Sequence, residues 1–421
     1  MQQASRPSFW RARAAAAATA CLLAAAGVSA LLALALFLPG LDYALILGTW
    51  GLAVSGLLLL LAVGAAVSAL RRRSRLRGLA AGLAACALLA TGVAGSAQLR
   101  SAQAAGTPVS WGQATGIGQR GQLPDLEPVF MEDHDSGQRL QAGIWLPRHQ
   151  GTGRVLSREE VLAAHPEGVP VVVLLHGGGW RTGDRRNPMT KGQATWLARQ
   201  GYLAVALDYP LALPGLPTWW LAESRTALGL AWVGRHAADW GGDAQRLALV
   251  GDSAGGHLAL ELAERQVLGT LGEVCPEPVP QVRAVSLTYP VTDPARFHDS
   301  PDPLMAPYVA GRAAMYTGGS PRQEPQRYRE ISPVAKAQAL REQGLGAQMP
   351  PVLIVHGERD HVVPVAGSEQ LHQELVQAGA RSQLVVVPYA DHVFDLNPGS
   401  LPSQQWRHLT LELLQRVGLG L

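Results

Sequence analysis

A short glycine-flanked segment of the chain carries a serine in a setting typical of a nucleophile. Gly251-Asp252-Ser253-Ala254-Gly255 has the form G-x-S-x-G and directly follows the apolar run at 247–250. A strand-to-helix turn with this spacing bends the backbone sharply, so that a side chain at either glycine would clash. The turn also holds the Ser253 hydroxyl at a helix N-terminus, which favours a developing anion. We therefore predict that Ser253 attacks an electrophile.

Two later loops supply a base and an acid for such a serine. Asp360 follows the apolar run at 351–355, and His392 follows the run at 383–387. Loops after parallel strands gather at one edge of a sheet, so these side chains can meet Ser253 there. His392 would take the Ser253 proton, and Asp360 would orient the imidazole and stabilise its charged form.

The sequence His-Gly-Gly-Gly-Trp at 176–180 directly follows the apolar run at 169–175. Consecutive glycines let the backbone approach a ligand closely. We predict that the amides of Gly178 and Gly179, with that of Ala254, form an oxyanion hole; Gly177 is a weaker candidate.

Several nearby residues compete for these roles. Glu358 could replace Asp360 as the acid, and Asp391 is interpreted as a loop residue beside His392. Three further histidines are given structural roles, His257 in the core and His176 and His356 as braces of their loops.

Two residues near the glycine motif are candidate contacts for a substrate. They are Trp180 and Asp184, and for Asp184 a place in a surface turn is an equal alternative. No metal site is expected, since no cysteine pair has the spacing of metal ligands.

Composition separates the N-terminal part from the rest. The chain is 48% hydrophobic and 16% charged, below the roughly 25% charged residues of average chains. Residues 1–98 hold eight arginines and one acidic residue, Asp42, whereas the remainder is net acidic. A basic, apolar N-terminal part favours membrane association over nucleic-acid binding, which we do not expect.

Three stretches without charges, at about 14–39, 43–70 and 78–99, reach the roughly 20 residues that a bilayer-spanning helix needs. They predict an anchor within residues 1–100. Arginines at 6–13 and 71–77 place both flanks in the cytoplasm. If the third stretch spans, the remainder of the chain lies on the extracytoplasmic side, as we expect; if it does not, that remainder is cytoplasmic.

The rest of the chain alternates short apolar runs with helical stretches. Residues 101–123 read as a linker, and residues 124–421 as one domain. Apolar runs of this length suit parallel strands buried on both faces, which predicts a doubly wound α/β sheet. The strands are expected at 128–132, 140–146, 169–175, 202–207, 247–250, 282–289, 351–355 and 383–387. Residues 293–330 interrupt this rhythm and are interpreted as a lid-like insertion.

Together these motifs resemble the α/β-hydrolase superfamily, in its esterase and lipase group related to hormone-sensitive lipase. GDSAGGHLA at 251–259, HGGGW with Gly183-Asp184, and HGERDHVVP at 356–364 are similar to BD-FAE-like and kynurenine-formamidase-like carboxylesterases. The resemblance covers about residues 125–421. It implies an α/β-hydrolase fold, with Ser253, Asp360 and His392 as catalytic triad.

We therefore expect a membrane-anchored serine hydrolase that cleaves carboxylic esters through an acyl-enzyme, without any cofactor. The partners expected are the bilayer and a small or lipid-like ester; the sequence sets no oligomeric state. Two alternatives stay open. An acyltransferase would use the same triad, and a non-catalytic binding protein would use only the scaffold.

Overall fold

The protein is described here from a computed structural model. The structure describes residues 75–116 and 120–421, and the single positions 17, 20, 60, 64 and 67. The first two predicted membrane segments, 14–39 and 43–70, lie outside these continuous ranges.

Eight strands form one sheet in the order β1-β2-β4-β3-β5-β6-β7-β8. β2 pairs antiparallel with both β1 and β4, and all the other pairs are parallel. Every apolar run that predicted a strand overlaps one of these strands, which confirms the predicted sheet. The strands are β1 Val129–Asp133, β2 Gln138–Trp145, β3 Val169–Leu175, β4 Leu203–Leu207, β5 Gly242–Asp252, β6 Val282–Thr288, β7 Val352–Gly357 and β8 Ser382–Val387.

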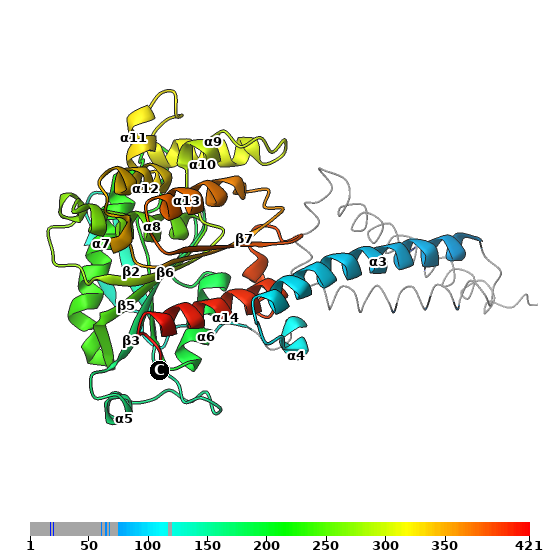
Figure 1. Ribbon diagram of the computed structural model, residues 1–421, viewed down its shortest axis with the longest axis horizontal. Helices are drawn as coiled ribbons and strands as arrows, with labels where there is room; N and C mark the ends of the chain where they lie inside the picture. The colour runs from blue at the N-terminus through cyan, green and yellow to red at the C-terminus, as the bar shows by residue number, and fades with distance from the viewer. Residues whose placement is uncertain are drawn as a thin grey trace, which may run out of the picture.

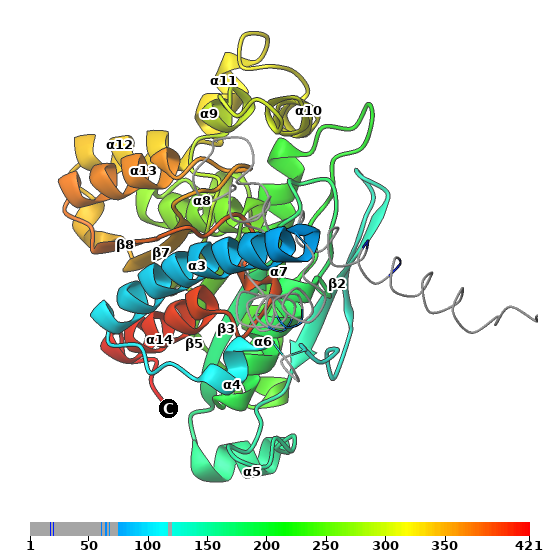
Figure 2. The ribbon, with the colours of Figure 1, turned by 90° about the vertical axis from the view of Figure 1, so that its right-hand side faces the viewer.

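Helices cover both faces of this sheet (Figures 1 and 2). α7, α8, α12 and α13 lie on one face, whereas α6, α14 and the end of α3 lie on the other. The helices are α3 Arg75–Ala104, α4 Trp111–Ala114, α5 Arg158–Ala164, α6 Pro188–Arg199, α7 Trp219–His236, α8 Ala254–Leu268, α9 Pro294–His298, α10 Ala306–Thr317, α11 Pro325–Glu330, α12 Pro333–Glu342, α13 Ala366–Gln377 and α14 Leu401–Arg416.

The central strand β3 shows how the sequence builds two cores. All of its residues are buried, and successive side chains point to opposite faces of the sheet. Val171 and Val173 join the core beneath α7 and α8, whereas Val172 and Leu174 join the core beneath α6 and α14. Burial of each of these side chains contributes about 1.5–3 kcal/mol to stability. Both helix layers therefore hold β3 in place, and the glycine motif follows its C-terminal end.

The helix α3 covers the third predicted membrane segment and the start of the predicted linker. Its last turn packs on α14, where Ala102 is fully buried and the Gln405 Nε2 donates to the carbonyl of Ser101 at 3.1 Å. The predicted linker is therefore packed against the domain at these residues, because its small side chains fit beside α14 and the α14 amides of Gln404 and Gln405 bond its backbone. Among the described residues, no helix meets the length and apolarity that a bilayer crossing requires.

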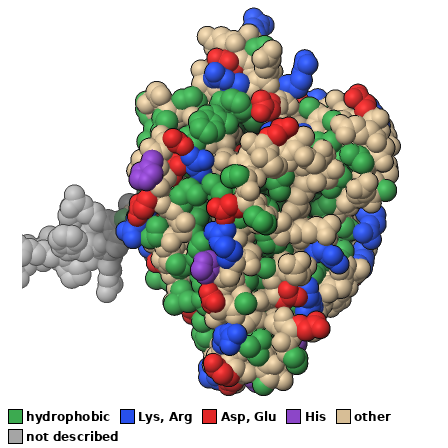
Figure 3. Space-filling view, turned by 90° about the vertical axis from the view of Figure 1, so that its left-hand side faces the viewer, with side chains coloured by type: hydrophobic (Ala, Val, Ile, Leu, Met, Phe, Trp, Pro, Cys, Tyr) green, Lys and Arg blue, Asp and Glu red, His purple; other side chains and the backbone are tan. Residues whose placement is uncertain are grey.

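The segment between β6 and β7 contains α9, α10 and α11, which stand above the C-terminal ends of the central strands (Figure 1). This is the range interpreted as a lid-like insertion, and we call residues 293–330 the cap. The molecular face turned away from α3 carries acidic and basic side chains interspersed with apolar ones (Figure 3). That face therefore has no extended basic patch.

Candidate active site

Ser253 occupies a sharp turn between β5 and α8. Its φ of 53° is unusual for a residue with a side chain. A Cβ on Gly255 would lie 2.0 Å from the Leu175 carbonyl oxygen, and one on Gly251 would lie 2.6 Å from that of Gly255. The two glycines are therefore required by close backbone packing, which holds Ser253 at the N-terminus of α8.

The structure brings the three predicted triad residues together. His392 Nε2 lies 3.1 Å from Ser253 Oγ, and His392 Nδ1 lies 2.7 Å from Asp360 Oδ2. Both distances permit hydrogen bonds. Ser253 and His392 keep 7% and 8% of their surface exposed, so the pair is largely shielded from water yet reachable.

Asp360 is fixed by its own loop. The amides of Val362 and Val363 donate to its Oδ1 at 2.9 and 2.7 Å, which leaves Oδ2 for His392. Burial alone would raise the pKa of Asp360, but His392 and His356 together hold it well below its usual range. The carboxylate is thus charged at neutral pH and can orient the imidazole.

The contact between Asp360 and His392 also changes the basicity of His392. Burial alone would lower the pKa of His392, yet the charge and hydrogen bond of Asp360 raise it above its usual value. Tyr289 packs against the imidazole with ring centroids 4.4 Å apart. His392 is therefore a stronger base than a free imidazole and is held in place from one side by an aromatic ring.

The glycine loop after β3 offers free amides beside Ser253. Gly178 and Gly179 have φ of 128° and 57°, in the region that favours glycine. Among the described residues, no acceptor faces the N–H groups of Gly178, Gly179 or Ala254. These are the three predicted oxyanion donors, and their amides are unused by the fold.

The Gly177 amide is not free to donate to an oxyanion. It donates to Asp252 Oδ2 at 2.9 Å, which ties the glycine loop to the nucleophile turn. Burial and the nearby Asp395 raise the pKa of Asp252 to about 8. The role of Asp252 was not foreseen, although its place beside Ser253 in the motif could have drawn attention to it.

Arg312 of α10 was also missed by sequence reasoning. Its Nη1 donates to the carbonyl oxygen of Gly178 at 2.6 Å and to Thr182 Oγ1 at 3.1 Å. A Cβ on Gly179 would lie only 2.5 Å from the Arg312 Cδ. No motif signals this contact, because it joins the cap to a loop more than a hundred residues earlier.

The two candidate substrate contacts take part in packing and turn formation. Trp180 is fully buried and stacks on Tyr316 of the cap, with ring centroids 4.4 Å apart. Asp184 Oδ1 accepts from the amide of Arg186 at 2.6 Å, as expected of a turn residue. Nothing in this geometry supports direct contact of Trp180 with a substrate, since its side chain is sealed beneath the cap.

The competing acids lie apart from the His392 imidazole. Glu358 accepts from the Tyr389 amide at 3.1 Å. Asp391 accepts from the amides of His361 and His392 and so braces the loop. Neither carboxylate takes the place of Asp360 at Nδ1.

The other histidines have structural partners. His257 is fully buried, its Nε2 lies 2.7 Å from the Ile331 carbonyl, and burial lowers its pKa to about 3. His176 contacts the Gly177 carbonyl at 2.8 Å, and His356 lies 2.8 Å from both Ser368 Oγ and the Val363 carbonyl. They brace their loops, as the sequence suggested.

Comparison with known families agrees with this geometry. Residues 162–375, slightly more than half of the chain, match the family model described as BD-FAE. The chain belongs to the BD-FAE family. The match includes the glycine motif, the nucleophile turn and Asp360, and ends before His392.

Curated relatives of this BD-FAE protein include ester hydrolases from Mycobacterium tuberculosis. The probable carboxylic ester hydrolase LipM is 30% identical over 54% of this chain and 50% of its own length. Esterase LipC is 29% identical over 55% of this chain and 54% of its own length. The chain therefore spans about half the length of the curated relatives it matches.

Solved structures support the fold. Esterase 2 of Thermogutta terrifontis in its propionate-bound form has a TM-score of 0.51 and 24% identity, covering 70% of this chain and 94% of the esterase. The same esterase phosphonylated by sarin has a TM-score of 0.52 at 22% identity, covering 71% and 97%. At this identity the likeness establishes the α/β-hydrolase fold alone.

Proposed function

We propose that the protein is a serine carboxylesterase that works through an acyl-enzyme on Ser253. The observation that carries this proposal is the continuous chain of contacts Ser253 Oγ to His392 Nε2 at 3.1 Å and His392 Nδ1 to Asp360 Oδ2 at 2.7 Å. The names of the mycobacterial relatives, an ester hydrolase and an esterase, support the same chemistry.

In the first step Ser253 Oγ attacks the ester carbonyl carbon while His392 Nε2 accepts its proton. The carbonyl oxygen becomes an anion, and the amides of Gly178, Gly179 and Ala254 are proposed to stabilise it. Each such donor is worth on the order of 3 kcal/mol in the transition state. His392 then gives the proton to the departing alcohol, and the acyl group stays on Ser253.

In the second step water replaces the alcohol. His392 takes a proton from the water, the hydroxide oxygen bonds to the acyl carbon, and the bond to Ser253 Oγ breaks. The free acid leaves and Ser253 regains its proton. Asp360 stays ionised throughout and stabilises the imidazolium, which agrees with its depressed pKa.

The test is hydrolysis of p-nitrophenyl acetate, butyrate and palmitate by the full-length protein in a mild detergent. Ser253→Ala should abolish turnover, whereas Ser157→Ala, at the start of the distant α5, should keep it. Product analysis with an added alcohol separates hydrolysis from acyl transfer, since a transferase would form a new ester. Absence of turnover in folded wild-type protein would favour a binding role on this scaffold.

We further propose that the chain is anchored in a membrane, with the catalytic domain on the extracytoplasmic side. The arginine clusters at 6–13 and 71–77 support cytoplasmic flanks for the first two segments, and the proposed side of the catalytic domain requires that α3 crosses as well. On α3, the large apolar side chains of Leu79, Leu89 and Val93 are exposed and would suit lipid. Reporter fusions after residue 105 test the topology, and a cytoplasmic signal there would contradict it.

A further inference from the structure

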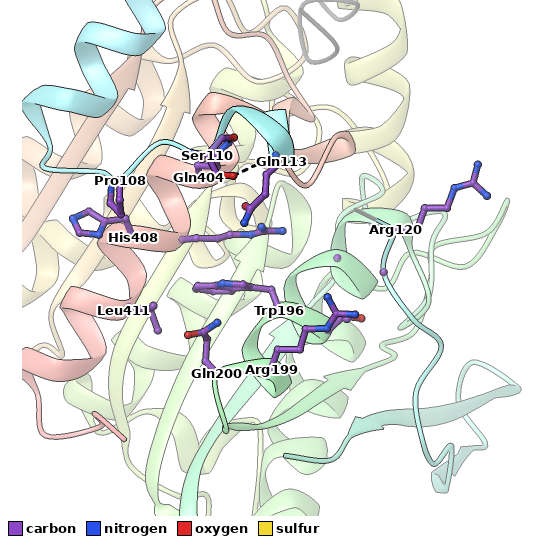
Figure 4. A pocket seen from close by; sticks show the side chains of 14 residues that line it. Pro108, Ser110, Gln113, Arg120, Trp196, Arg199, Gln200, Gln404, His408 and Leu411 are labelled. Atoms are coloured by element: carbon purple, nitrogen blue, oxygen red, sulfur yellow. Dashed lines mark hydrogen bonds between the residues drawn. The ribbon is translucent and has the colours of Figure 1, made fainter. Parts of the chain in front are cut away.

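A cavity that shares no lining residue with the triad lies between α4, α6 and α14 (Figure 4). It has a volume of about 350 Å³. Its walls come from the segment after α3, from α6 and from α14, and include Trp196 and three arginines, Arg120, Arg199 and Arg407. Among the described residues, no carboxylate lines it. The cavity is therefore positively charged and has no acidic group of its own.

Two of these arginines, Arg199 and Arg407, have no ion-pair partner among the described residues. Arg407 lies over the ring of Trp196, 5.5 Å from its centroid. The side chains of Arg407 and Arg199 form no hydrogen bond or ion pair with any residue in the described ranges. By contrast, Arg185 and Arg265 are each paired with a buried carboxylate.

The two arginine side chains also carry like charges and repel each other. Burial lowers the pKa of Arg407 to about 10, Asp395 offsets part of this effect, and Arg199 adds to the lowering. The Asp395 carboxylate accepts from Gln193 and Tyr289, and among the described residues it forms no hydrogen bond or ion pair with Arg407. A bound anion would neutralise two like charges that the protein leaves uncompensated.

Arg120 contributes differently. It stands at the rim, and its side chain extends away from the labelled group around Trp196 (Figure 4). Ser110, Gln113 and Gln200 add polar groups to the wall. The anion-binding part is therefore the Arg199–Arg407 pair, and the rest of the cavity offers an aromatic face and hydrogen-bonding groups.

We propose that this cavity binds a phosphate ester, with the phosphate oxygens between Arg199 and Arg407 and the esterified group against Trp196. Planar guanidinium groups match phosphate oxygens in a bidentate manner. The cavity exceeds the size of a single phosphate, so it has room for the esterified group. A phospholipid headgroup is one source of this phosphate ester, because Pro108, four residues after the end of α3, lines the cavity and α3 is proposed above to contact lipid. A soluble phosphate ester is the other source.

The experiment uses the full-length protein in a nonionic detergent. Three probes are titrated by calorimetry: inorganic phosphate, dioctanoyl phosphatidylglycerol and dioctanoyl phosphatidylcholine. The variants are Arg199→Gln and Arg407→Gln, with Arg322→Gln as matched control, since Arg322 is an exposed arginine in the cap. Thermal unfolding of each variant verifies that it is folded. Substitution of Arg199 should disturb folding less than that of Arg407, because the Arg199 side chain is exposed.

We expect the wild type and Arg322→Gln to bind phosphate, phosphatidylglycerol or both. Arg199→Gln should bind the same anion about tenfold more weakly, because it loses one charge-assisted hydrogen bond. Tighter binding of phosphatidylglycerol than of phosphate, with no binding of phosphatidylcholine, would support a lipid source. Equal binding of phosphate and phosphatidylglycerol would support a soluble ester. The proposal is overturned if wild type binds neither anion, or if folded Arg199→Gln binds them as wild type does.

Discussion

The Arg312 guanidinium donates to the carbonyl oxygen of Gly178 at 2.6 Å, across the boundary between the cap and the loop after β3. In a trans peptide the carbonyl of one residue and the N–H of the next point in opposite directions. The bond from Arg312, together with those from the amides of Arg181 and Thr182, therefore sets the direction of the Gly179 N–H, which is a proposed oxyanion donor. Arg312 is thus a positioning residue that acts through the peptide it holds.

Replacement of Arg312 should lower kcat more than it changes KM, because the oxyanion forms only in the transition state. We expect Arg312→Met to lower kcat about tenfold, less than the loss of a donor itself. Arg312→Lys should recover part of the rate. Arg329→Met, which removes an exposed arginine of the same cap, is the control. Equal effects of the two Met variants would contradict a positioning role.

Gly179→Ala tests the space beside Arg312. The new Cβ would lie 2.5 Å from Arg312 Cδ at a φ of 57°, so the loop must shift. We expect kcat for ester hydrolysis to fall on the order of a hundredfold, in line with loss of an oxyanion donor. Gly137→Ala is the matched control, since its φ is 68° but nothing surrounds the added methyl. It should cost about 1 kcal/mol of stability and leave kcat unchanged.

The pH profile follows from the charge of Asp360. Ester hydrolysis needs neutral His392, and Asp360 raises the pKa of His392. Activity should therefore rise with pH along a limb whose midpoint in kcat/KM lies above about 6.5, the usual value for histidine. Asp360→Asn should move this midpoint downward and reduce kcat by about 10⁴-fold. A wild-type midpoint below the usual value would contradict the pairing.

Glu264 gives a prediction about stability. It is fully buried, its carboxylate has no hydrogen-bond partner in the described part of the chain, and burial raises its pKa well above the usual range. Because the folded state then binds a proton that the unfolded state releases, stability falls as pH rises from about 4.3 toward the raised pKa. Glu264→Gln should remove this pH-dependent loss of stability. The free energy of unfolding of Glu264→Gln, measured with denaturant, should therefore increase relative to that of wild type between pH 5 and 8.

Glu412→Gln is the control for Glu264, since its carboxylate is partly exposed and lies on the surface of α14. This variant should not change the slope of stability with pH by a comparable amount. A constant difference between Glu264→Gln and wild type across the pH range would show that Glu264 is ionised in the folded protein.

The sequence predicts the sheet well, and the reason is visible in β3. Its seven residues are all apolar and all buried, so the pattern follows directly from a strand covered on both faces. The nucleophile turn is equally local, since Gly251 and Gly255 are dictated by nearby backbone. The meeting of Ser253, Asp360 and His392 follows from the loops that lie at one edge of the sheet.

Other features depend on contacts that no local pattern encodes. In α12, the buried Lys336 is accommodated because it forms an ion pair with Glu261 of α8. Arg312 reaches Gly178 only after the cap has docked. The predicted linker packs on α14 through Gln404 and Gln405, whose amide groups give no periodic signal. Long-range packing, rather than local propensity, decides each of these.

The central claim is that Ser253 is the nucleophile of an assembled triad. The most direct measurement treats the full-length protein with a fluorophosphonate and locates the adduct by peptide mass spectrometry. We predict one adduct per chain, on the peptide that contains Ser253, with parallel loss of ester hydrolysis and no labelling of His392→Ala on the same timescale. An adduct on another residue, or none on folded protein, would contradict it.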